Sequence, residues 1–283
     1  MILGTEYKAY AKINLGLDIL YRREDGLHEV DMIMASLALH DSLFFKANTS
    51  GEITLEMVGF FGNIEDNLIY RAAIKMQQKF DISAGVEIKL IKRIPVAAGL
   101  AGGSSDCAVT LNALSIIWGI AASTAEKKAL AVELGADVTY CLFHKMARVT
   151  GIGEKIRFIS TLPKIYVVLF KPKYGISTAE AYQKVSNKKI NHIDIDMLEK
   201  KLASGSYDEI CAAVGNSFEQ PTFAEYPDLA YLKQVLKADA DVSILSGSGP
   251  TIFALTKSID KRDKLALIGE ENGFLAIKTE TKR

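Results

Sequence analysis

Residues 95–106 (PVAAGLAGGSSD) have the composition of a phosphate-binding loop. They follow an alternating apolar run and precede a helical pattern, and their small residues let the backbone approach an anion closely. Free N–H groups at a helix start carry partial positive charge, and Ser104 and Ser105 add hydroxyl donors. A glycine-rich turn with a serine N-cap is the ordinary alternative, and it is disfavoured because the whole string follows a strand. The residues expected to contact phosphate are Pro95, Val96, Ala97, Ala98, Gly99, Leu100, Ala101, Gly102, Gly103, Ser104, Ser105 and Asp106.

An aspartate and a lysine elsewhere are candidates for moving a proton and stabilising charge, and an asparagine beside the lysine can hydrogen-bond a substrate hydroxyl. Asp137 ends the break Gly135-Ala136-Asp137 after an apolar helical run, where a turn can direct its carboxylate into a cleft. The residues alone favour a turn or cap role for it. Lys12 lies in an apolar strand, where a lone lysine usually faces solvent, and Asn14 shares its face.

Three further features could bind a ligand. Residues 246–250 (SGSGP) form a second small-residue loop, for which a plain hairpin turn is the alternative. His28 follows the turn at Gly26, where an exposed histidine needs no special role. Tyr182 lies in a helical run, where a core position and a ligand contact are equally favoured.

Hydrophobic periodicity predicts strands first and helices later, which indicates an α+β fold rather than a regular parallel α/β sheet. A domain boundary is expected near 160–164, giving lobes 1–160 and 161–283. The expected strands are 7–19, 30–39, 41–45, 52–58, 86–94, 146–149, 154–159, 165–170, 242–245, 252–255 and 275–279. The expected helices are 67–80, 104–118, 125–134, 177–185, 195–203, 207–214, 229–236 and 259–272.

Composition excludes several classes of protein. Lys plus Arg and Asp plus Glu each number 34, so net charge gives no reason to bind nucleic acid or an anionic membrane. Cys107, Cys141 and Cys211 form no CxxC pair, which disfavours a disulfide framework or a zinc site. No secretory signal and no run of roughly 18 apolar residues is present. We expect a cytoplasmic protein with a small-molecule substrate and no nucleic-acid or membrane partner; a homodimer is compatible with the sequence and is not determined by it.

These segments resemble the GHMP kinases. Beside the loop 95–106, the stretches 11–15 (AKINL), 25–29 (DGLHE), 135–138 (GADV) and 245–250 (LSGSGP) stand in the family's order, and the resemblance covers about residues 7–278. The resemblance implies a two-lobed GHMP kinase fold with the active site in the cleft between the lobes. It implies ATP with Mg²⁺ as phosphate donor, with no metal ligand assigned. Stretches 11–15 and 25–29 narrow it to members that phosphorylate a cytidyl-linked sugar alcohol in non-mevalonate isoprenoid precursor synthesis.

The resemblance also assigns residue roles. Lys12 and Asp137 match the family's catalytic pair. Asn67 and Lys92 match positions that border the ATP, beside the loop 95–106. The matched substrate-binding residues are Asn14, Leu27, His28, Thr178 and Tyr182. The matched residues of the active-site loop are Gly247, Ser248 and Gly249.

Four positions depart from the family pattern: Tyr10 and Thr139 replace usual prolines, and the other two concern ligand binding. Leu27 stands where relatives usually have a tyrosine that covers the cytosine, and Ile152 stands where they usually have a lysine or arginine. Arg148 and Lys145 are the nearby cations that could replace the missing charge. The departures leave two alternatives open: a GHMP kinase of another small alcohol, and a non-catalytic protein that binds a nucleotide.

Overall fold

The computed structural model describes residues 5–58, 63–159, 164–185, 190–204 and 206–282. The chain forms two compact units, which are described separately. The first unit comprises Met1–Ala11, Leu39–Ile94 and Ala101–His144. The second unit comprises Lys12–Ala38, Pro95–Leu100 and Lys145–Arg283. The predicted lobes 1–160 and 161–283 divide the chain at one position, whereas each observed unit is built from three separate segments of the chain. Residues 160–163, at the predicted boundary, lie outside the described residues.

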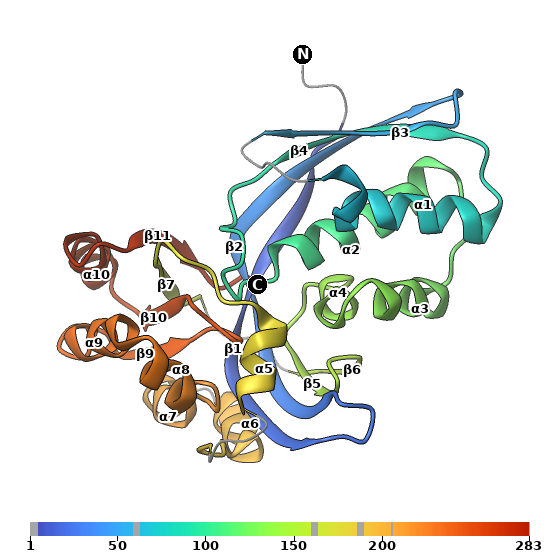
Figure 1. The fold of residues 1–283 in the computed structure, drawn as a ribbon. Coiled ribbons are helices and arrows are strands. Elements are labelled where there is room, and N and C mark those ends of the chain that lie inside the picture. Colours follow the sequence, from blue (N-terminus) through green and yellow to red (C-terminus); the bar gives the residue numbers. More distant parts are fainter. Residues whose placement is uncertain (1–4, 59–62, 160–163, 186–189, 205, 283) are drawn as a thin grey trace. The chain divides into compact units, whose positions relative to one another are not determined.

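The first unit combines a short sheet with helices. Strand β4 (Gly85–Ile91) pairs antiparallel with residues 42–48 of β2 (His28–Asn48) and parallel with β3 (Ile53–Val58). Helix α1 (Leu68–Phe80) packs beside α2 (Gly102–Ile117), as Figure 1 shows. The remaining elements of this unit are η1 (Ile64–Asp66), α3 (Thr124–Leu134) and α4 (Ala136–Cys141).

The second unit contains residues from two sheets. Residues 30–34 of β2 pair with β5 (Ala147–Gly151), which pairs with β6 (Lys155–Phe158). Strand β1 (Tyr7–Arg22), whose residues from Lys12 onward belong to this unit, pairs in parallel with β8 (Gly215–Asn216). The second sheet has the order β11 (Leu275–Glu280), β7 (Tyr166–Lys171), β10 (Ile252–Thr256) and β9 (Val242–Leu245). The helices of this unit are α5 (Thr178–Val185), α6 (Ile195–Ser204), α7 (Tyr207–Ala213), α8 (Glu219–Glu225), α9 (Pro227–Leu236) and α10 (Ile259–Glu271).

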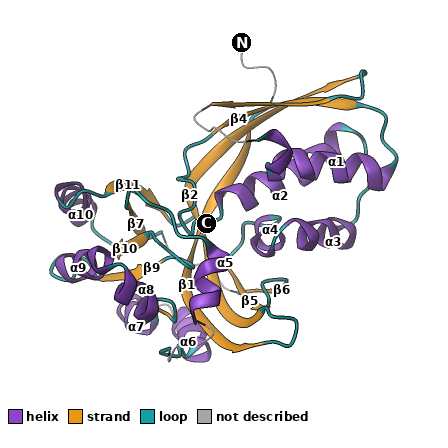
Figure 2. Ribbon diagram, in the orientation of Figure 1, coloured by secondary structure: helices purple, strands orange, loops and turns teal. Residues whose placement is uncertain are grey.

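Both units mix helices with strands, so the α+β prediction is confirmed (Figure 2). The separate strands predicted at 30–39 and 41–45 were wrong, because β2 continues through the polar residues His40 and Asp41. Asp41 stays inside the strand because it is fully buried and accepts hydrogen bonds from the backbone N–H groups of Arg93 and Ile94. Helices α4 and α8 were not predicted.

The close contact between α10 and β7 depends on a glycine. The residues of β7 from Val167 to Phe170 are fully buried. A β-carbon on Gly269 of α10 would lie 2.3 Å from Cδ1 of Phe170. The absence of a side chain at this point therefore sets how closely the helix approaches the strand.

We predict that Gly269→Ala lowers the free energy of unfolding by about 1–3 kcal/mol, because the added methyl group overpacks the core. Urea denaturation measures it. Leu267→Ala is the matched control on the same helix, since the Leu267 side chain is 60% exposed. If Gly269→Ala is no less stable than this control, the described packing is incorrect.

Candidate active site

The Lys12 ammonium group lies buried at the centre of a cluster in the second unit. Its Nζ donates to Asn14 Oδ1 at 2.8 Å and to the Gly99 carbonyl at 3.2 Å. This contact confirms that the two side chains share a face of the strand. Lys12 is 3% exposed and Asn14 is fully buried, so Lys12 does not face solvent as a lone lysine in a strand usually does. A buried charge is tolerated only where polar atoms compensate it, so this site is built to hold a cation.

The second small-residue loop lies against the same ammonium group. A β-carbon on Gly247 would lie 3.3 Å from Lys12 Nζ and 3.2 Å from the Gly99 carbonyl. Ser246 Oγ donates to that carbonyl at 3.1 Å, and a β-carbon on Gly99 would lie 2.2 Å from the Ser246 carbonyl. Glycine is therefore required where the two loops meet, and the hairpin-only interpretation of residues 246–250 misses this contact.

The phosphate loop alternates its backbone conformation. Ala97, Gly99 and Ala101 have φ of +50°, +72° and +54°. Alternation of this kind turns successive N–H groups toward one side and forms an anion-binding concavity. A left-handed conformation is expected at a glycine such as Gly99, but Ala97 and Ala101 adopt it as well, at a cost in strain that is characteristic of functional loops. Gly102 and Gly103 are the first residues of α2.

A buried ion-pair triad lies beneath the start of α2 in the first unit. Lys92 Nζ pairs with Asp41 and, at 2.8 Å, with Asp106. Burial would lower the pKa of Lys92, but Asp106 and Asp41 outweigh it and raise that pKa. Burial raises the pKa of Asp106 to about 7, against the opposing charge of Lys92. A β-carbon on Gly102 would lie 3.2 Å from Lys92 Nζ, so the triad supports the first turn of α2.

The other predicted residues of the first unit lie at helix starts. Asp137 is the second residue of α4 and is half-buried. Asn67 is the N-cap of α1, and its Oδ1 accepts from Ile69 N at 2.9 Å. Ser105 Oγ lies 3.3 Å from Nε2 of His144, which has a φ of +46°. Asn67 therefore has a structural role, and its contact with ATP stays a prediction.

Aromatic rings gather at the residues predicted to hold the substrate. The rings of His28 and Tyr182 lie 5.1 Å apart, and Tyr182 meets the ring of Phe218 edge-on at 4.8 Å. Burial, followed by the charge of Arg22, lowers the pKa of His28, which keeps the imidazole neutral for hydrogen bonding. Leu27 is 49% exposed, and its N–H is held by Asp25 Oδ1 at 3.0 Å. Thr178 accepts a hydrogen bond from Ser248 at 3.2 Å.

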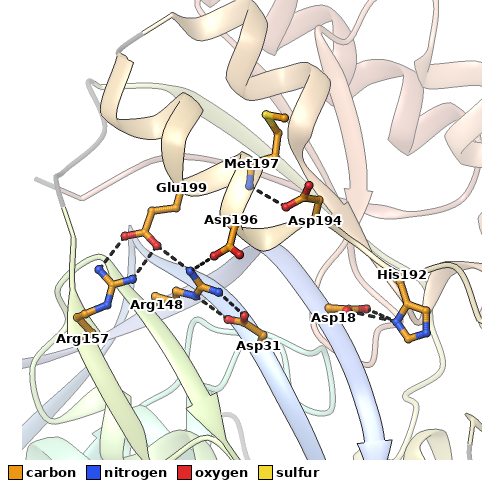
Figure 3. A network of polar contacts seen from close by, with 9 residues as sticks. All are labelled: Asp18, Asp31, Arg148, Arg157, His192, Asp194, Asp196, Met197 and Glu199. Carbon is orange, nitrogen blue, oxygen red and sulfur yellow. Dashed lines mark hydrogen bonds and ion pairs between the residues drawn. The ribbon is translucent and has the colours of Figure 1, made fainter.

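Arg148 does not serve as a free cation for phosphate. Figure 3 shows it between Asp31 of β2 and the acidic residues of α6. It contacts Asp31 through two nitrogens and also pairs with Asp196 at 2.6 Å and Glu199 at 2.9 Å. These carboxylates, Asp31 first, raise the pKa of Arg148. Of the two cations that could replace the charge missing at Ile152, Arg148 is therefore already neutralised by three carboxylates.

The structure thus brings Lys12, Asn14 and Gly99 together with Gly247 and the neighbouring loop residues in one cluster, and it brings His28 to Tyr182. Lys92 and Asp106 form a second group in the first unit, and Asp137 of α4 belongs to the same unit. Other residues that support these groups had no signal in the sequence, because each is a single polar or aromatic side chain outside any motif. They are Asp41, His144, Asn216 and Phe218.

Within the part of the chain that the structure describes, no group of three or more His, Cys, Asp or Glu side chains could hold a metal ion. Among the helices so described, none has both the length and the apolar character of a membrane span.

Comparison with known proteins defines the family. The family model of the GHMP kinase N-terminal domain matches residues 67–145, and that of the C-terminal domain matches residues 193–273. The chain therefore belongs to the GHMP kinases.

Individual relatives indicate which members of this family the chain is similar to. The chain is 44% identical to 4-diphosphocytidyl-2-C-methyl-D-erythritol kinase of Bacillus cytotoxicus, over 88% of this chain and 86% of the relative. The chain is 39% identical to the same kinase of Listeria monocytogenes, over 91% of this chain and 88% of the relative. A crystal structure of 4-(cytidine 5'-diphospho)-2C-methyl-D-erythritol kinase matches with a TM-score of 0.84 and 32% identity, covering 99% of this chain and 100% of that one. The resemblance stated from sequence is confirmed, as is the GHMP kinase fold.

We predict that Gly102→Val raises the KM for ATP by at least about tenfold, because the branched side chain displaces the backbone that faces the phosphates. A β-carbon at this position would lie 3.0 Å from Ile94 Cγ2 and 3.2 Å from Lys92 Nζ. Steady-state kinetics at saturating acceptor measure it. Gly103→Ala is the matched control, since a β-carbon there meets no atom of the described residues within 4 Å. An unchanged KM in a folded Gly102→Val protein contradicts the phosphate-binding role of this turn.

The triad predicts a pH-dependent stability. The ordinary pKa of an aspartate is 3.8, and the pKa of Asp106 in the folded protein is about 7. At pH values between these two, the folded protein therefore binds more protons at Asp106 than the unfolded chain does. The contribution of Asp106 to the free energy of unfolding is therefore complete below the lower value and is lost as pH rises through the higher one. We expect the unfolding free energy of the wild type, relative to Asp106→Asn, to fall as pH rises from about 4 to about 8. Denaturant titrations across this range test it, and a constant or rising difference contradicts it.

Proposed function

We propose that this chain transfers the γ-phosphoryl group of ATP to the 2-hydroxyl of 4-diphosphocytidyl-2-C-methyl-D-erythritol. The observation that carries the proposal is the Lys12 cluster, in which one buried ammonium group contacts the phosphate loop and approaches the second glycine loop. The relatives at 39–44% identity that bear this enzyme's name support the choice of acceptor.

Lys12 is proposed to stabilise charge on the moving phosphoryl group. Phosphoryl transfer spreads negative charge over the transferred oxygens, so catalysis depends on positioned cations and donors. Asn14 and the Gly99 carbonyl fix the direction of the ammonium group before the substrates arrive. The N–H groups of the alternating loop backbone and of the start of α2 would hold the phosphates of ATP.

Asp137 is proposed to accept the proton of the acceptor hydroxyl. A carboxylate at the second position of α4 is half-buried and is held on a helix that starts directly after Gly135. A rigid attachment of this kind suits a group that must meet the hydroxyl within hydrogen-bond distance. The match to the family's Gly-Ala-Asp stretch adds support to this role.

The cytidine of the acceptor is proposed to bind at His28 and Tyr182. A neutral imidazole offers one donor and one acceptor to the edge of a base, and a tyrosine ring offers a face on which the base stacks. Phe218 supports the Tyr182 ring from its edge.

Mg²⁺ is proposed to accompany ATP, and the residues present fit it. Mg²⁺ is usually bound by one or two carboxylates together with substrate phosphates, so a dedicated cluster of protein ligands is not required. Asp106 Oδ1, at the end of the phosphate loop, is buried without a hydrogen-bond partner among the described residues and is a suitable oxygen ligand. When bound, the ion supplies charge neutralisation on the phosphates.

A second candidate function is phosphorylation of another small alcohol. It is favoured by one observation: Leu27 is half-exposed and presents no ring to a base. The non-catalytic alternative is less well supported, because Lys12 and Asp137 are both retained. A cytoplasmic location and the absence of nucleic-acid partners stay predictions.

We predict that Asp137→Asn lowers kcat by about 10²–10⁴-fold, because the amide no longer accepts the hydroxyl proton. Turnover of the cytidyl acceptor with ATP measures it, with the melting temperature as a test of folding. Asp66→Asn, a surface change in η1 of the same unit, is the control and should keep full activity. A kcat near the wild-type value in folded Asp137→Asn removes this residue from the mechanism.

A further inference from the structure

The turn between β8 and α8 holds the second glycine loop through a buried amide. Asn216 is 3% exposed, and its Nδ2 donates to the carbonyls of Leu245 at 2.7 Å and Gly247 at 2.8 Å. Its Oδ1 accepts from Phe218 N at 2.9 Å. Both hydrogens of the amide are therefore used on the loop, and its oxygen fixes the turn from which it projects.

Glu219 completes this attachment. Its Oε1 accepts from Leu245 N at 3.1 Å, and its carboxylate is paired with Lys233 of α9 at 2.7 Å. Both backbone polar groups of Leu245, the last residue of β9, thus have side-chain partners within residues 216–219. The second glycine loop leaves the sheet from a fixed point.

The atoms that Asn216 holds are adjacent to the reacting end of the site. The carbonyl of Gly247 accepts the hydrogen bond from Asn216. A β-carbon on the same Gly247 would lie 3.3 Å from Lys12 Nζ. Ser246, the residue before it, donates to the same Gly99 carbonyl that accepts from Lys12. A displacement of Gly247 would therefore disturb both Lys12 and the phosphate loop.

The same turn also supports the ring proposed to stack on the base. Phe218 is 1% exposed and meets Tyr182 edge-on, with ring planes at 83°. Asn216 and Phe218 are two residues apart and are joined by the hydrogen bond between Oδ1 and N–H. Residues 216–218 therefore contact both Gly247, near the proposed site of phosphoryl transfer, and Tyr182, at the proposed binding site of the base.

We propose that Asn216 is a positioning residue, which sets Gly247 against Lys12, while the neighbouring Phe218 supports the base-stacking ring by its own ring contact. The inference rests on the proposed function for the identity of the acceptor. Asn216 acts through the loop and touches neither substrate. Its loss should therefore reduce kcat while leaving the KM for the cytidyl acceptor nearly unchanged, because Phe218 keeps its ring contact.

The test compares Asn216→Ala and Asn216→Asp with Ser217→Ala. Asn216→Asp keeps the shape but directs an oxygen at two carbonyl oxygens. Ser217 is a matched control on the same turn, because its fully buried hydroxyl donates to Asp18 of β1 at 2.7 Å rather than to the loop. We expect both Asn216 variants to lose about 10- to 100-fold in kcat, the scale expected for misplaced catalytic groups, and Ser217→Ala to lose less than about twofold. Melting temperatures identify any variant that does not fold.

A kcat in Asn216→Ala close to the wild-type value overturns the inference, and so does an equal loss in Ser217→Ala, which would indicate a general structural role. The ¹⁵N signal of the Lys12 ammonium group, assigned with Lys12→Arg, gives a readout that needs no acceptor. It should shift in Asn216→Ala and stay in place in Ser217→Ala; an unchanged signal in folded Asn216→Ala contradicts the inference. If the wild type does not phosphorylate the cytidyl compound, the proposed function fails, and this signal still decides the role of Asn216.

Discussion

The burial of one ammonium group is the constraint on which the candidate site depends. Lys12 lies on a strand whose neighbouring residues are apolar, and it is almost fully removed from solvent. Such a charge costs several kcal/mol unless polar atoms surround it. Here Asn14 Oδ1 and the Gly99 carbonyl supply acceptors, and Ser246 shares the second of them. The phosphate loop is thus part of the lysine's own environment, so the conformation of the loop and the direction of the charge are set together.

Small residues in both loops follow from this arrangement. The carbonyl of Gly99 reaches Lys12, and the backbone of residues 246–249 lies directly against Gly99, where a β-carbon would be 2.2 Å from the Ser246 carbonyl oxygen. Gly247 and Gly249 adopt φ of +57° and +83°, which residues with side chains rarely accept. The loops therefore act as paired supports of one cation, and the side chains of Asn216 and Glu219 fix the second of them to the sheet.

Local patterns predicted much of this site, and long-range contacts decided the rest. The alternation in β4, the helical spacing of α1 and the small residues of 95–106 are local signals, and each predicted its element. Asp41 was predicted to begin a separate strand at 41–45 rather than to lie inside a longer one, because its partners, the N–H groups of Arg93 and Ile94, lie 52 and 53 residues further along the chain. Ala97 and Ala101 adopt left-handed conformations that no propensity favours, since the surrounding loop imposes them. Asn216 had no motif to mark it.

The measurement that tests the central claim most directly is kcat/KM of the wild-type chain for phosphoryl transfer from ATP to a panel of alcohols. The panel contains 4-diphosphocytidyl-2-C-methyl-D-erythritol, mevalonate and homoserine, with ³¹P NMR identifying the phosphorylated hydroxyl. Our account predicts that the cytidyl compound is preferred by at least about 10³-fold, because the His28 and Tyr182 contacts need a base and a site built for one rejects acceptors that leave it unfilled. Equal or faster transfer to mevalonate or homoserine would contradict it.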